Sequence, residues 1–454
     1  MNINAESKTA DKNGLLVGKE YSLADALAYE DTLRCVQCGY CLPVCPTHRT
    51  MGTETQSPRG RINLVKMAAE GKVSDLSVLA EPIDLCLGCR ACETACPVGV
   101  PYGHILEQTR HVLWEKQQKE TKQTWRQKAQ NWFYRKVFPN ARRMQRVGDL
   151  LWLYQQTIGR TGHWFTSLPV FPKSMREFAR ILPKMENPFY RRQISESYTH
   201  QTAAITSQSN MAFLFTGCIM DVMFHRINRQ TGRLLNRYDW RVAVPHTQSC
   251  CGALHAHIGD LDTAKTLACK NIEAFEQSGA DILVHTAGGC GGMLFEYGKL
   301  LADDPDWSER AKRFSEKVKD ISEIAASVPQ EVFVKDVPLR ATYQSSCHLR
   351  YVAGVKDAPV QALQRIPGIT YVEMKEMDRC CGSAGIYNVV NYDASMEILD
   401  EKMENAANTH AQVLVTSNPG CLLQMKLGIE RHGMSEHMQA VHLVELLAQS
   451  CDIK

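Results

Sequence analysis

The sequence predicts a small helical N-terminal domain followed by a duplicated α/β domain. Its eighteen cysteines fall into two groups, with eight in residues 26–112, none in 113–205 and ten in 206–454. Within the second group, one cysteine pattern occurs twice at nearly equal spacing. The segments between those cysteines alternate between short apolar runs and helical patterns, which is typical of a parallel sheet covered by helices.

The composition limits the class of protein. A chain of 454 residues is long enough for roughly three domains. The N-terminal stretch is polar, without the apolar core of a signal peptide, and no apolar run approaches membrane-spanning length. We therefore expect a cytoplasmic protein, where thiols stay reduced and clustered cysteines indicate metal or redox chemistry rather than disulfides.

The N-terminal cysteines form two identical motifs. "CVQCGYCLPVCP" at 35–46 and "CLGCRACETACP" at 86–97 both follow C-x2-C-x2-C-x3-C-P. This spacing is typical of [4Fe–4S] ferredoxins, in which the fourth cysteine of each run ligates the other cluster. A pair of zinc sites is the alternative, but zinc usually takes C-x2-C pairs rather than triplets. The predicted ligands are Cys35, Cys38, Cys41 and Cys96 for the first cluster, and Cys86, Cys89, Cys92 and Cys45 for the second. The spacing between the runs and the flanking helical patterns favour an α-helical ferredoxin.

Residues 113–205 are expected to form basic helices, interrupted by prolines at 139, 169, 172, 183 and 188. Residues 110–192 contain eighteen Lys or Arg against five Asp or Glu, a local net charge of +13, so the rest of the chain carries 3 − 13 = −10. Five of the seven tryptophans lie there, at 114, 125, 132, 152 and 164. One interpretation is a surface that meets anionic lipid or quinone. The other is a solvated linker that packs on the ferredoxin domain or docks an acidic partner. Nothing besides charge favours nucleic acid.

The repeat can be followed element by element. Short strands are predicted at "MAFLFTGC", "RVAVP" and "DILVHT" in the first copy, and at "LRATYQSSC", "TYVEM" and "QVLVTS" in the second. A helix is predicted between the second and third strands of each copy, with an Asp near its start as a candidate cap. Both copies are expected to end in helices, at "VKDISEIAAS" and "VHLVELLAQS".

Each repeat cysteine of the pattern follows a predicted strand, so all of them should meet at the carboxyl edge of a sheet. Helix N-termini at that edge favour anionic thiolates. The candidate ligands are Cys218, Cys250, Cys251 and Cys290 in the first copy, and Cys347, Cys380, Cys381 and Cys421 in the second. Each set could hold a further cluster, a zinc ion or no metal. Cys269 and Cys451 are expected to be bystanders. The histidines His246, His255, His257 and His348 are expected to be surface or supporting residues rather than ligands.

Several motifs are missing from the sequence. There is no G-x-G-x-x-G after a strand, no P-loop, no C-x-x-C-H and no G-x-S-x-G. We therefore expect no flavin site and no catalytic residue in this chain. The two-electron oxidation of an organic substrate needs a flavin or nicotinamide as its acceptor, so a flavin is expected on another chain.

The pattern Cys, Cys-Cys-Gly, Cys resembles the cysteine-rich domain of the heterodisulfide reductase B subunit family. The order of domains resembles the iron–sulfur subunit family of glycolate oxidase, with relatives among anaerobic glycerol-3-phosphate dehydrogenase C subunits and lactate-utilisation proteins. The sequence departs from the reductase motif Cys-Pro-x-Cys, because Asn418 and Ala287 stand where its first cysteine would fall. The five-ligand site and the disulfide-cleaving activity of the reductases therefore do not carry over.

The resemblance implies an α-helical ferredoxin domain followed by a duplicated α/β cysteine-rich domain. It implies an electron-transfer subunit that relays electrons from an FAD-binding dehydrogenase partner, which oxidises glycolate, to quinone or another carrier, with peripheral attachment to the inner face of the cell membrane. Lactate and glycerol 3-phosphate are alternative substrates. A thiol–disulfide reductase and an iron–sulfur redox sensor are alternatives from other classes. The predicted segments are a polar lead at 1–25, the ferredoxin domain at 26–112, the linker at 113–205, and the repeats at 206–330 and 331–454.

Overall fold

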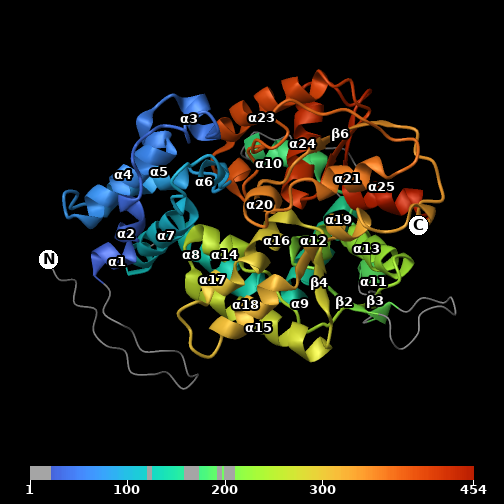
Figure 1. The fold of residues 1–454 in the computed structure, drawn as a ribbon, viewed down its shortest axis with the longest axis horizontal. Helices are drawn as coiled ribbons and strands as arrows, with labels where there is room; N and C mark the ends of the chain where they lie inside the picture. Colours follow the sequence, from blue (N-terminus) through green and yellow to red (C-terminus); the bar gives the residue numbers. More distant parts are fainter. Residues whose placement is uncertain (1–21, 120–124, 158–172, 192–196, 199–209, 454) are drawn as a thin grey trace. The chain divides into compact units, whose positions relative to one another are not determined.

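The computed structural model describes residues 22–119, 125–157, 173–191, 197–198 and 210–453 (Figure 1). Most of the predicted polar lead, together with Trp164, Pro169 and Pro172, lies outside them. The chain divides into two compact units. Unit 1 comprises residues 1–88, 92–122 and 257–259, and unit 2 comprises residues 89–91, 123–256 and 260–454. Among the described helices, none combines the length and the apolar character needed to cross a bilayer.

In its described part, unit 1 is built from helices around a small apolar core that includes Leu27, Val65, Ile83 and Ile105. The elements are α1 Leu23–Ala26, α2 Tyr29–Leu33, α3 Pro46–Met51, α4 Pro58–Ala69, α5 Ala80–Asp84, α6 Ala91–Thr94 and α7 Tyr102–Lys119, with 3-10 turns at Glu54–Gln56 and Leu76–Leu79. The proline of the first cysteine motif opens α3, because proline suits the first position of a helix. Pro58 does the same for α4, where the Ser57 hydroxyl accepts from the Gly60 N–H.

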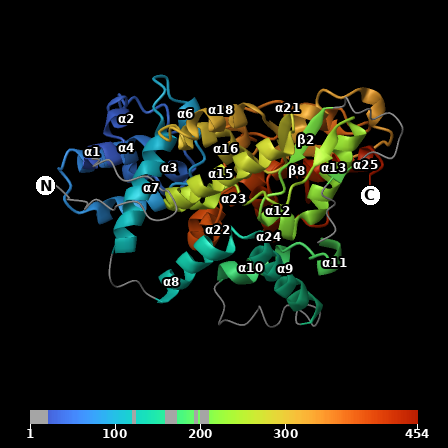
Figure 2. The same ribbon diagram turned by 90° about the horizontal axis from the view of Figure 1, so that it is seen from below.

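The linker helices belong to unit 2. They are α8 Trp125–Trp132, a π-helical turn at Phe133–Val137, α9 Ala141–Gln156, α10 Lys173–Ile181 and α11 Pro188–Arg191. Figure 2 shows them along one side of the repeats. Arg135 forms a two-pronged ion pair with Asp260, at 2.8 and 3.2 Å, and the Gln145 amide donates to Asp221 at 2.5 Å. The described linker residues therefore pack on the repeats, an arrangement that was not among the alternatives considered from the sequence.

The first repeat contains a sheet of order β1-β3-β2-β4-β5 among the described strands. Its members are β1 Ser197–Tyr198, β2 Met211–Leu214, β3 Arg241–Ala243, β4 Ile282–His285 and β5 Val318–Asp320. All neighbours are parallel except β1 and β3. The surrounding helices are α12 Ile219–Met223, α13 His225–Arg237, α14 Ala253–Ile258, α15 Leu261–Ser278, α16 Gly288–Phe295, α17 Tyr297–Leu300, α18 Ser308–Glu316 and α19 Ile321–Ala325.

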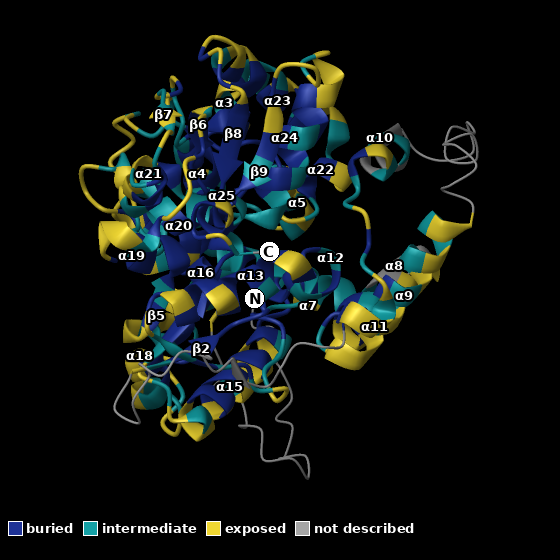
Figure 3. Ribbon diagram, turned by 90° about the vertical axis from the view of Figure 1, so that its right-hand side faces the viewer, coloured by how far each residue is buried: buried dark blue, intermediate teal, exposed yellow. Residues whose placement is uncertain are grey.

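The second repeat has the same plan. Its described sheet is wholly parallel, in the order β7-β6-β8-β9, with β6 Arg340–Gln344, β7 Thr370–Tyr371, β8 Val413–Thr416 and β9 Gln439–His442. Its helices are α20 Cys347–Tyr351, α21 Ala358–Gln364, α22 Tyr387–Val390, α23 Tyr392–Ala407, α24 Pro419–Arg431 and α25 Leu443–Ser450, after a 3-10 turn at Gln330–Val332. Figure 3 shows the central strands β6 and β8 buried. The predicted fold class, a helical ferredoxin domain followed by a duplicated α/β domain, is confirmed.

Two details of the predicted repeat are wrong. Both copies end in a strand followed by a helix rather than in a helix alone, because β5 and β9 run directly into α19 and α25. The predicted cap of α15 is correct, since the Asp260 carboxylate accepts from the Thr263 N–H. In α23 the position before the helix is Asn391 and no side chain caps it, while Asp393 lies inside the first turn.

Candidate iron–sulfur centres

Cys35, Cys38, Cys41 and Cys96 line one cavity in unit 1, and Cys92 also reaches it. The empty space, including its open mouth, is about 410 Å³. The loop that carries the first three thiols turns through left-handed backbone at Gln37, with φ 59°, and Gly39, with φ 87°. A Cβ at Gly39 would lie 3.1 Å from the Arg59 guanidinium, so a residue without a side chain suits this turn. A cavity lined by the four predicted ligands suits a bound cluster.

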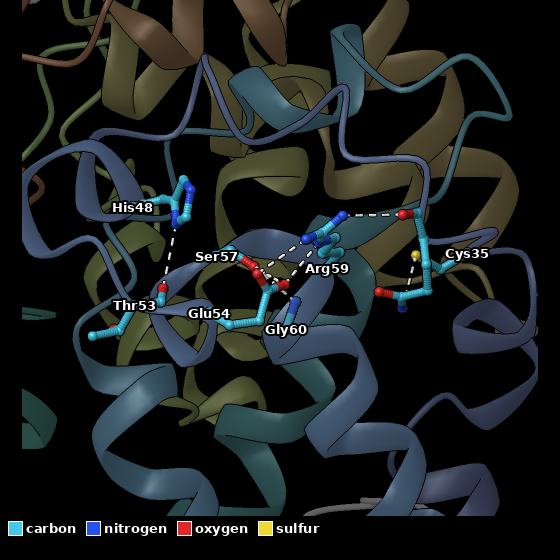
Figure 4. A network of polar contacts seen from close by, with 8 residues as sticks. Cys35, His48, Thr53, Glu54, Ser57, Arg59 and Gly60 are labelled. Carbon is cyan, nitrogen blue, oxygen red and sulfur yellow. Dashed lines mark hydrogen bonds and ion pairs between the residues drawn. The ribbon is translucent and has the colours of Figure 1, made fainter.

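A polar network fastens this loop to α4 (Figure 4). Arg59 donates to the Gln37 carbonyl at 3.1 Å and forms a two-pronged ion pair with Glu54 at 2.7 and 3.1 Å. The hydrogen bond from Arg59 keeps the pKa of the Glu54 carboxyl below its usual value. The Gln37 amide in turn donates to Cys35 Sγ at 3.5 Å.

Cys45 and Cys86, two of the predicted ligands of the second cluster, are both buried. Cys86 Sγ accepts from the Tyr102 hydroxyl at 3.3 Å and from the Gly88 N–H at 3.4 Å. Burial alone would raise the pKa of the Cys86 thiol, but the guanidinium groups of Arg61 and Arg110 and these hydrogen bonds hold it below its usual value. A thiol whose pKa is lowered by its surroundings loses its proton more readily, which suits it to binding metal.

The four thiols of the first repeat are joined in series. Cys218 Sγ lies 3.5 Å from Cys250 Sγ, and hydrogen bonds between side chains continue from Cys250 to Cys251 and from Cys251 to Cys290. The hydrogen bond from Cys218 lowers the pKa of Cys250 well below its usual value. The same contacts, together with burial, raise the pKa values of Cys218 and Cys251.

The second repeat repeats this arrangement. Cys347 is hydrogen-bonded to Cys380, Cys380 to Cys381 and Cys381 to Cys421. As predicted, each of these thiols follows a strand. Cys347 opens α20, and Cys421 lies in the first turn of α24, where unpaired N–H groups and the helix dipole favour negative charge. Both repeats therefore gather their four predicted thiols at the carboxyl edge of a sheet.

The glycine of each Cys-Cys-Gly motif has a structural reason. Gly252 and Gly382 both have φ 87°, a backbone conformation that disfavours residues with a side chain. A Cβ at Gly382 would lie 2.8 Å from the Ser395 carbonyl of α23, and one at Gly252 would lie 3.3 Å from Ala264 of α15. The glycine thus lets the paired cysteines turn tightly against the helix.

Asn418 stands where the reductase motif has a cysteine, and its side chain forms a hydrogen bond with the first repeat. Its side-chain oxygen accepts from the Gly289 N–H at 3.0 Å, and its amide group donates to Cys421 Sγ at 3.4 Å. Because Gly289 is near the start of α16, the amide of the second repeat satisfies an open N–H at the helix that carries Cys290. Ala287, the corresponding residue of the first repeat, is buried at the N-cap position of α16.

Among the described residues, no cysteine forms a disulfide, and no three His, Cys, Asp or Glu side chains surround one point as metal ligands do. The donor sets nevertheless suit iron–sulfur clusters, because they consist of thiols at helix ends and in a cavity of unit 1. When bound, such clusters would supply one-electron transfer.

The two cysteines outside the motifs, Cys269 and Cys451, lie apart from these sets. Cys269 lies inside α15, and burial raises its pKa to about 11. Cys451 follows α25 and lies in the apolar core. His255 Nε2 lies 2.9 Å from the Tyr134 carbonyl, so it contacts the linker.

Sequence reasoning missed two residues that hold the first Cys-Cys-Gly loop. The Asn271 amide donates to the Cys250 carbonyl at 3.0 Å, and the Tyr297 hydroxyl donates to the Cys251 carbonyl at 2.8 Å. Both residues come from helices, where nothing in the local sequence distinguishes them from ordinary helical positions.

Comparison with known families matches four segments. A 4Fe-4S dicluster domain matches residues 31–100, the linker region of glycolate oxidase iron-sulfur subunits matches 125–182, and a cysteine-rich domain matches 212–295 and 341–426. These matches cover the ferredoxin motifs, most of the described linker and both repeats.

Curated relatives agree with the family matches. The chain is 41% identical over 432 residues to the probable glycolate oxidase iron-sulfur subunit of Bacillus subtilis (strain 168), covering 93% of this chain and 95% of that protein. It is 28% identical over 407 residues to the glycolate oxidase iron-sulfur subunit of Escherichia coli (strain K12), covering 88% and 91%. Lactate utilization protein A of Oceanobacillus iheyensis is 34% identical over 238 residues, which is 52% of this chain and 95% of that protein.

The cysteine sets, the duplicated sheets, the linker and the full-length similarity all lead to one assignment. The chain belongs to the family of glycolate oxidase iron–sulfur subunits, which are electron-transfer subunits of an oxidoreductase complex.

Proposed function

We propose that this chain relays electrons within a flavin-linked 2-hydroxy-acid dehydrogenase that oxidises glycolate to glyoxylate. The observation that carries the choice of glycolate is the similarity over nearly the whole chain, linker included, to proteins named as glycolate oxidase subunits. The lactate utilization proteins align with only about half of this chain. No comparable observation favours glycerol 3-phosphate.

The chemistry requires a partner. Oxidation of a hydroxy acid releases two electrons and two protons, whereas an iron–sulfur cluster accepts one electron at a time. We propose that a flavin on a separate dehydrogenase subunit takes the electron pair. This chain would hold its clusters through two N-terminal sets, Cys35, Cys38, Cys41 and Cys96, and Cys86, Cys89, Cys92 and Cys45. The role of this chain's residues is to hold those thiols in place and partly shielded from water.

We further propose that the repeats bind clusters through Cys218, Cys250, Cys251 and Cys290, and through Cys347, Cys380, Cys381 and Cys421. The series of contacts between thiols and their position at helix N-termini support this proposal. A thiol–disulfide reductase is disfavoured, because Asn418 replaces a cysteine of the reductase motif and its amide is already bonded to Gly289 and Cys421.

The substrate can be tested with the co-purified complex. The full chain would be expressed together with its flavin-binding dehydrogenase partner and mixed anaerobically with glycolate, lactate or glycerol 3-phosphate. We expect glycolate to reduce the iron–sulfur clusters fastest, as followed by EPR. The clusters of the chain alone should remain oxidised. Faster reduction by another substrate would overturn the choice of glycolate, and reduction of the chain alone would overturn the relay.

The repeat sites can be tested by counting iron and sulfide in anaerobic protein. We expect more than about eight irons per wild-type chain, since two four-iron clusters account for eight. The double variant Cys380→Ser/Cys381→Ser should lose iron. A matched control, Cys269→Ser/Cys451→Ser, removes two thiols outside the sets and should not. Equal iron in all three proteins would overturn the proposal for the second repeat.

We also propose that the outer face of α9 and α11 attaches the protein to the anionic inner surface of the cell membrane, where quinone is available. The exposed side chains on this face are Arg142, Arg143, Arg146, Leu150 and Leu153 of α9, and Phe189 and Tyr190 of α11. Apolar side chains next to guanidinium groups suit a lipid surface, and the local net charge of +13 suits anionic headgroups.

Vesicle flotation tests this attachment. The full chain should float with vesicles of phosphatidylcholine and phosphatidylglycerol, but not with phosphatidylcholine alone. The variant Arg142→Gln/Arg143→Gln/Arg146→Gln should stay in solution, while the control Lys312→Gln/Arg313→Gln/Lys317→Gln, an equal charge change near α18, should still float. If the wild type fails to float, the proposal is wrong. If it fails to float but binds the dehydrogenase through these arginines, the face docks a protein instead.

A further inference from the structure

Arg61, near the start of α4, is buried in the ferredoxin unit with about 1% of its surface exposed. Its guanidinium donates to three oxygen atoms. Nε reaches the Pro82 carbonyl at 2.6 Å, and Nη2 reaches Gln56 Oε1 at 2.7 Å and Thr47 Oγ1 at 3.1 Å. All three acceptors are uncharged, so these bonds hold the side chain in place without neutralising it.

In the described part of the chain, Arg61 forms no ion pair with an Asp or Glu, although most of the other buried arginine side chains do. A buried charge without an opposite charge is strongly unfavourable. Proteins therefore retain one where a bound group supplies the opposite sign.

The groups of opposite sign near Arg61 are thiols. Thr47 accepts from Arg61 and lies 3.3 Å from Cys45 Sγ, while Tyr102 links to Cys86 Sγ. Burial by itself would lower the pKa of the Arg61 guanidinium, but its interaction with the Cys86 and Cys45 thiols raises it above its usual value. Cys45 and Cys86 come from different motifs and belong to the same predicted ligand set.

Arg59 differs from Arg61 in both its charge partner and its exposure to solvent. It lies two residues earlier on α4, beside the loop of the other set, and its charge is matched by the two oxygens of Glu54. Its side chain is 28% exposed, so solvent screens it further. One cluster site therefore has a neutralised, screened arginine, and the other has a buried arginine without a carboxylate partner.

We propose that Arg61 sets the redox potential of the second cluster site, Cys86, Cys89, Cys92 and Cys45, above that of the first. The inference rests on the proposed ligand sets. Reduction adds one electron, delivered from the reduced flavin of the partner subunit, and makes this site one unit more negative. The fixed positive charge of Arg61 stabilises that added charge, so no proton has to enter with the electron. Electrons would therefore collect at this site before leaving the domain.

The test is an EPR-monitored redox titration of the anaerobic full-length protein. We expect Arg61→Met to lower the equilibrium constant for reduction of the second ferredoxin cluster by about tenfold. For a one-electron step this is a fall of ~59 mV in the redox potential. Arg61→Lys keeps the charge and should restore most of the potential. Lys66→Met removes a charge that acts on Glu70, on the same helix, and should shift neither cluster. A Cys38→Ser variant identifies the signal of the first cluster, which Arg61→Met should leave in place.

The outcomes separate charge from scaffolding. If Arg61→Met and Arg61→Lys lose iron equally and any remaining cluster keeps its potential, Arg61 only supports the loop and the inference is wrong. If Arg61→Met cannot be purified, Tyr102→Phe provides a second route, because it removes the O–H donor from Cys86 Sγ and should lower the same potential. An unchanged potential in Tyr102→Phe would also overturn the inference. A wild type that binds fewer than two clusters in the ferredoxin unit would instead overturn the proposed function.

Discussion

At the scale of single residues, the proposed cluster ligands differ from the residues that shape the backbone around them. Cys380 and Cys381 point into one set of thiols, and Gly382 behind them turns through φ 87° against α23. The glycine is as necessary as the cysteines, because no side chain fits between this turn and the Ser395 carbonyl. The doubled cysteine is therefore part of a three-residue unit.

Replacing that glycine should be costly. In Gly382→Ala we expect about 1–2 kcal/mol of backbone strain and a further ~1–3 kcal/mol from the clash with Ser395. Gly354→Ala is the matched control, because Gly354 has φ 74° but no atom within 4 Å of the added methyl. Thermal unfolding and iron content should fall more in Gly382→Ala. Equal losses in the two variants would mean that strain alone acts and the close approach is unimportant.

At the scale of elements, the linker is fastened to the repeats at helix ends. Asp260 is the N-cap of α15 and also the ion-pair partner of Arg135 in the linker. The Asp260 carboxylate thus caps the start of α15 and also holds the linker segment that contains Arg135. Burial alone would raise the pKa of the Asp260 carboxyl, but hydrogen bonds from Arg135 and Thr263 keep it below its usual value.

Two substitutions at Asp260 can separate these roles. Asp260→Asn retains a good cap but loses the charge, so we expect a loss of about 1–3 kcal/mol. Asp260→Ala should cost about 1 kcal/mol more. Because the folded state lowers the pKa of Asp260, its contribution is present at neutral pH and disappears as the pH falls through the folded pKa. Urea unfolding from pH 7 towards pH 3 should show a shallower decline in Asp260→Asn than in the wild type. Parallel curves would contradict this role.

At the scale of the whole molecule, the two repeats complete each other. Three hydrogen bonds cross from the second repeat to the start of α16 or the residues before it. Ser417 O accepts from Gly288 N at 2.9 Å, Asn418 Oδ1 accepts from Gly289 N at 3.0 Å, and His442 Nε2 lies 2.8 Å from Thr286 O. The helix that carries Cys290 therefore begins in one repeat and is capped by the other.

A substitution in the second repeat should therefore change the stability of α16 in the first. Asn418→Ala removes the acceptor for Gly289 N–H, and we expect faster hydrogen exchange over Gly288–Phe295 by about tenfold, since one lost hydrogen bond is worth roughly 1 kcal/mol or more. Asn418→Asp keeps an acceptor and should preserve protection. If protection changes only in α24, the helix that Asn418 itself precedes, the cross-repeat bond is unimportant.

The sequence was informative where spacing reports geometry. Cysteines after strands predicted that each set of four would meet at one sheet edge, because parallel strands share that edge. It failed where the information is not local. β5 and β9 are short and run into helices without a breaking residue, so their pattern reads as helix. Arg61 and Asn271 look like ordinary helical residues, and their importance depends on partners brought near only by folding.

The shared capping of α16 has a consequence for how the chain can evolve. Two copies that arose from one ancestor are usually free to diverge, exchange or be lost independently. Here the second copy supplies the acceptor Asn418, and the first supplies the Gly289 N–H that donates to it. A substitution at either end of this hydrogen bond therefore affects both copies. The difference between the copies at this position, Ala287 in the first and Asn418 in the second, is part of that dependence.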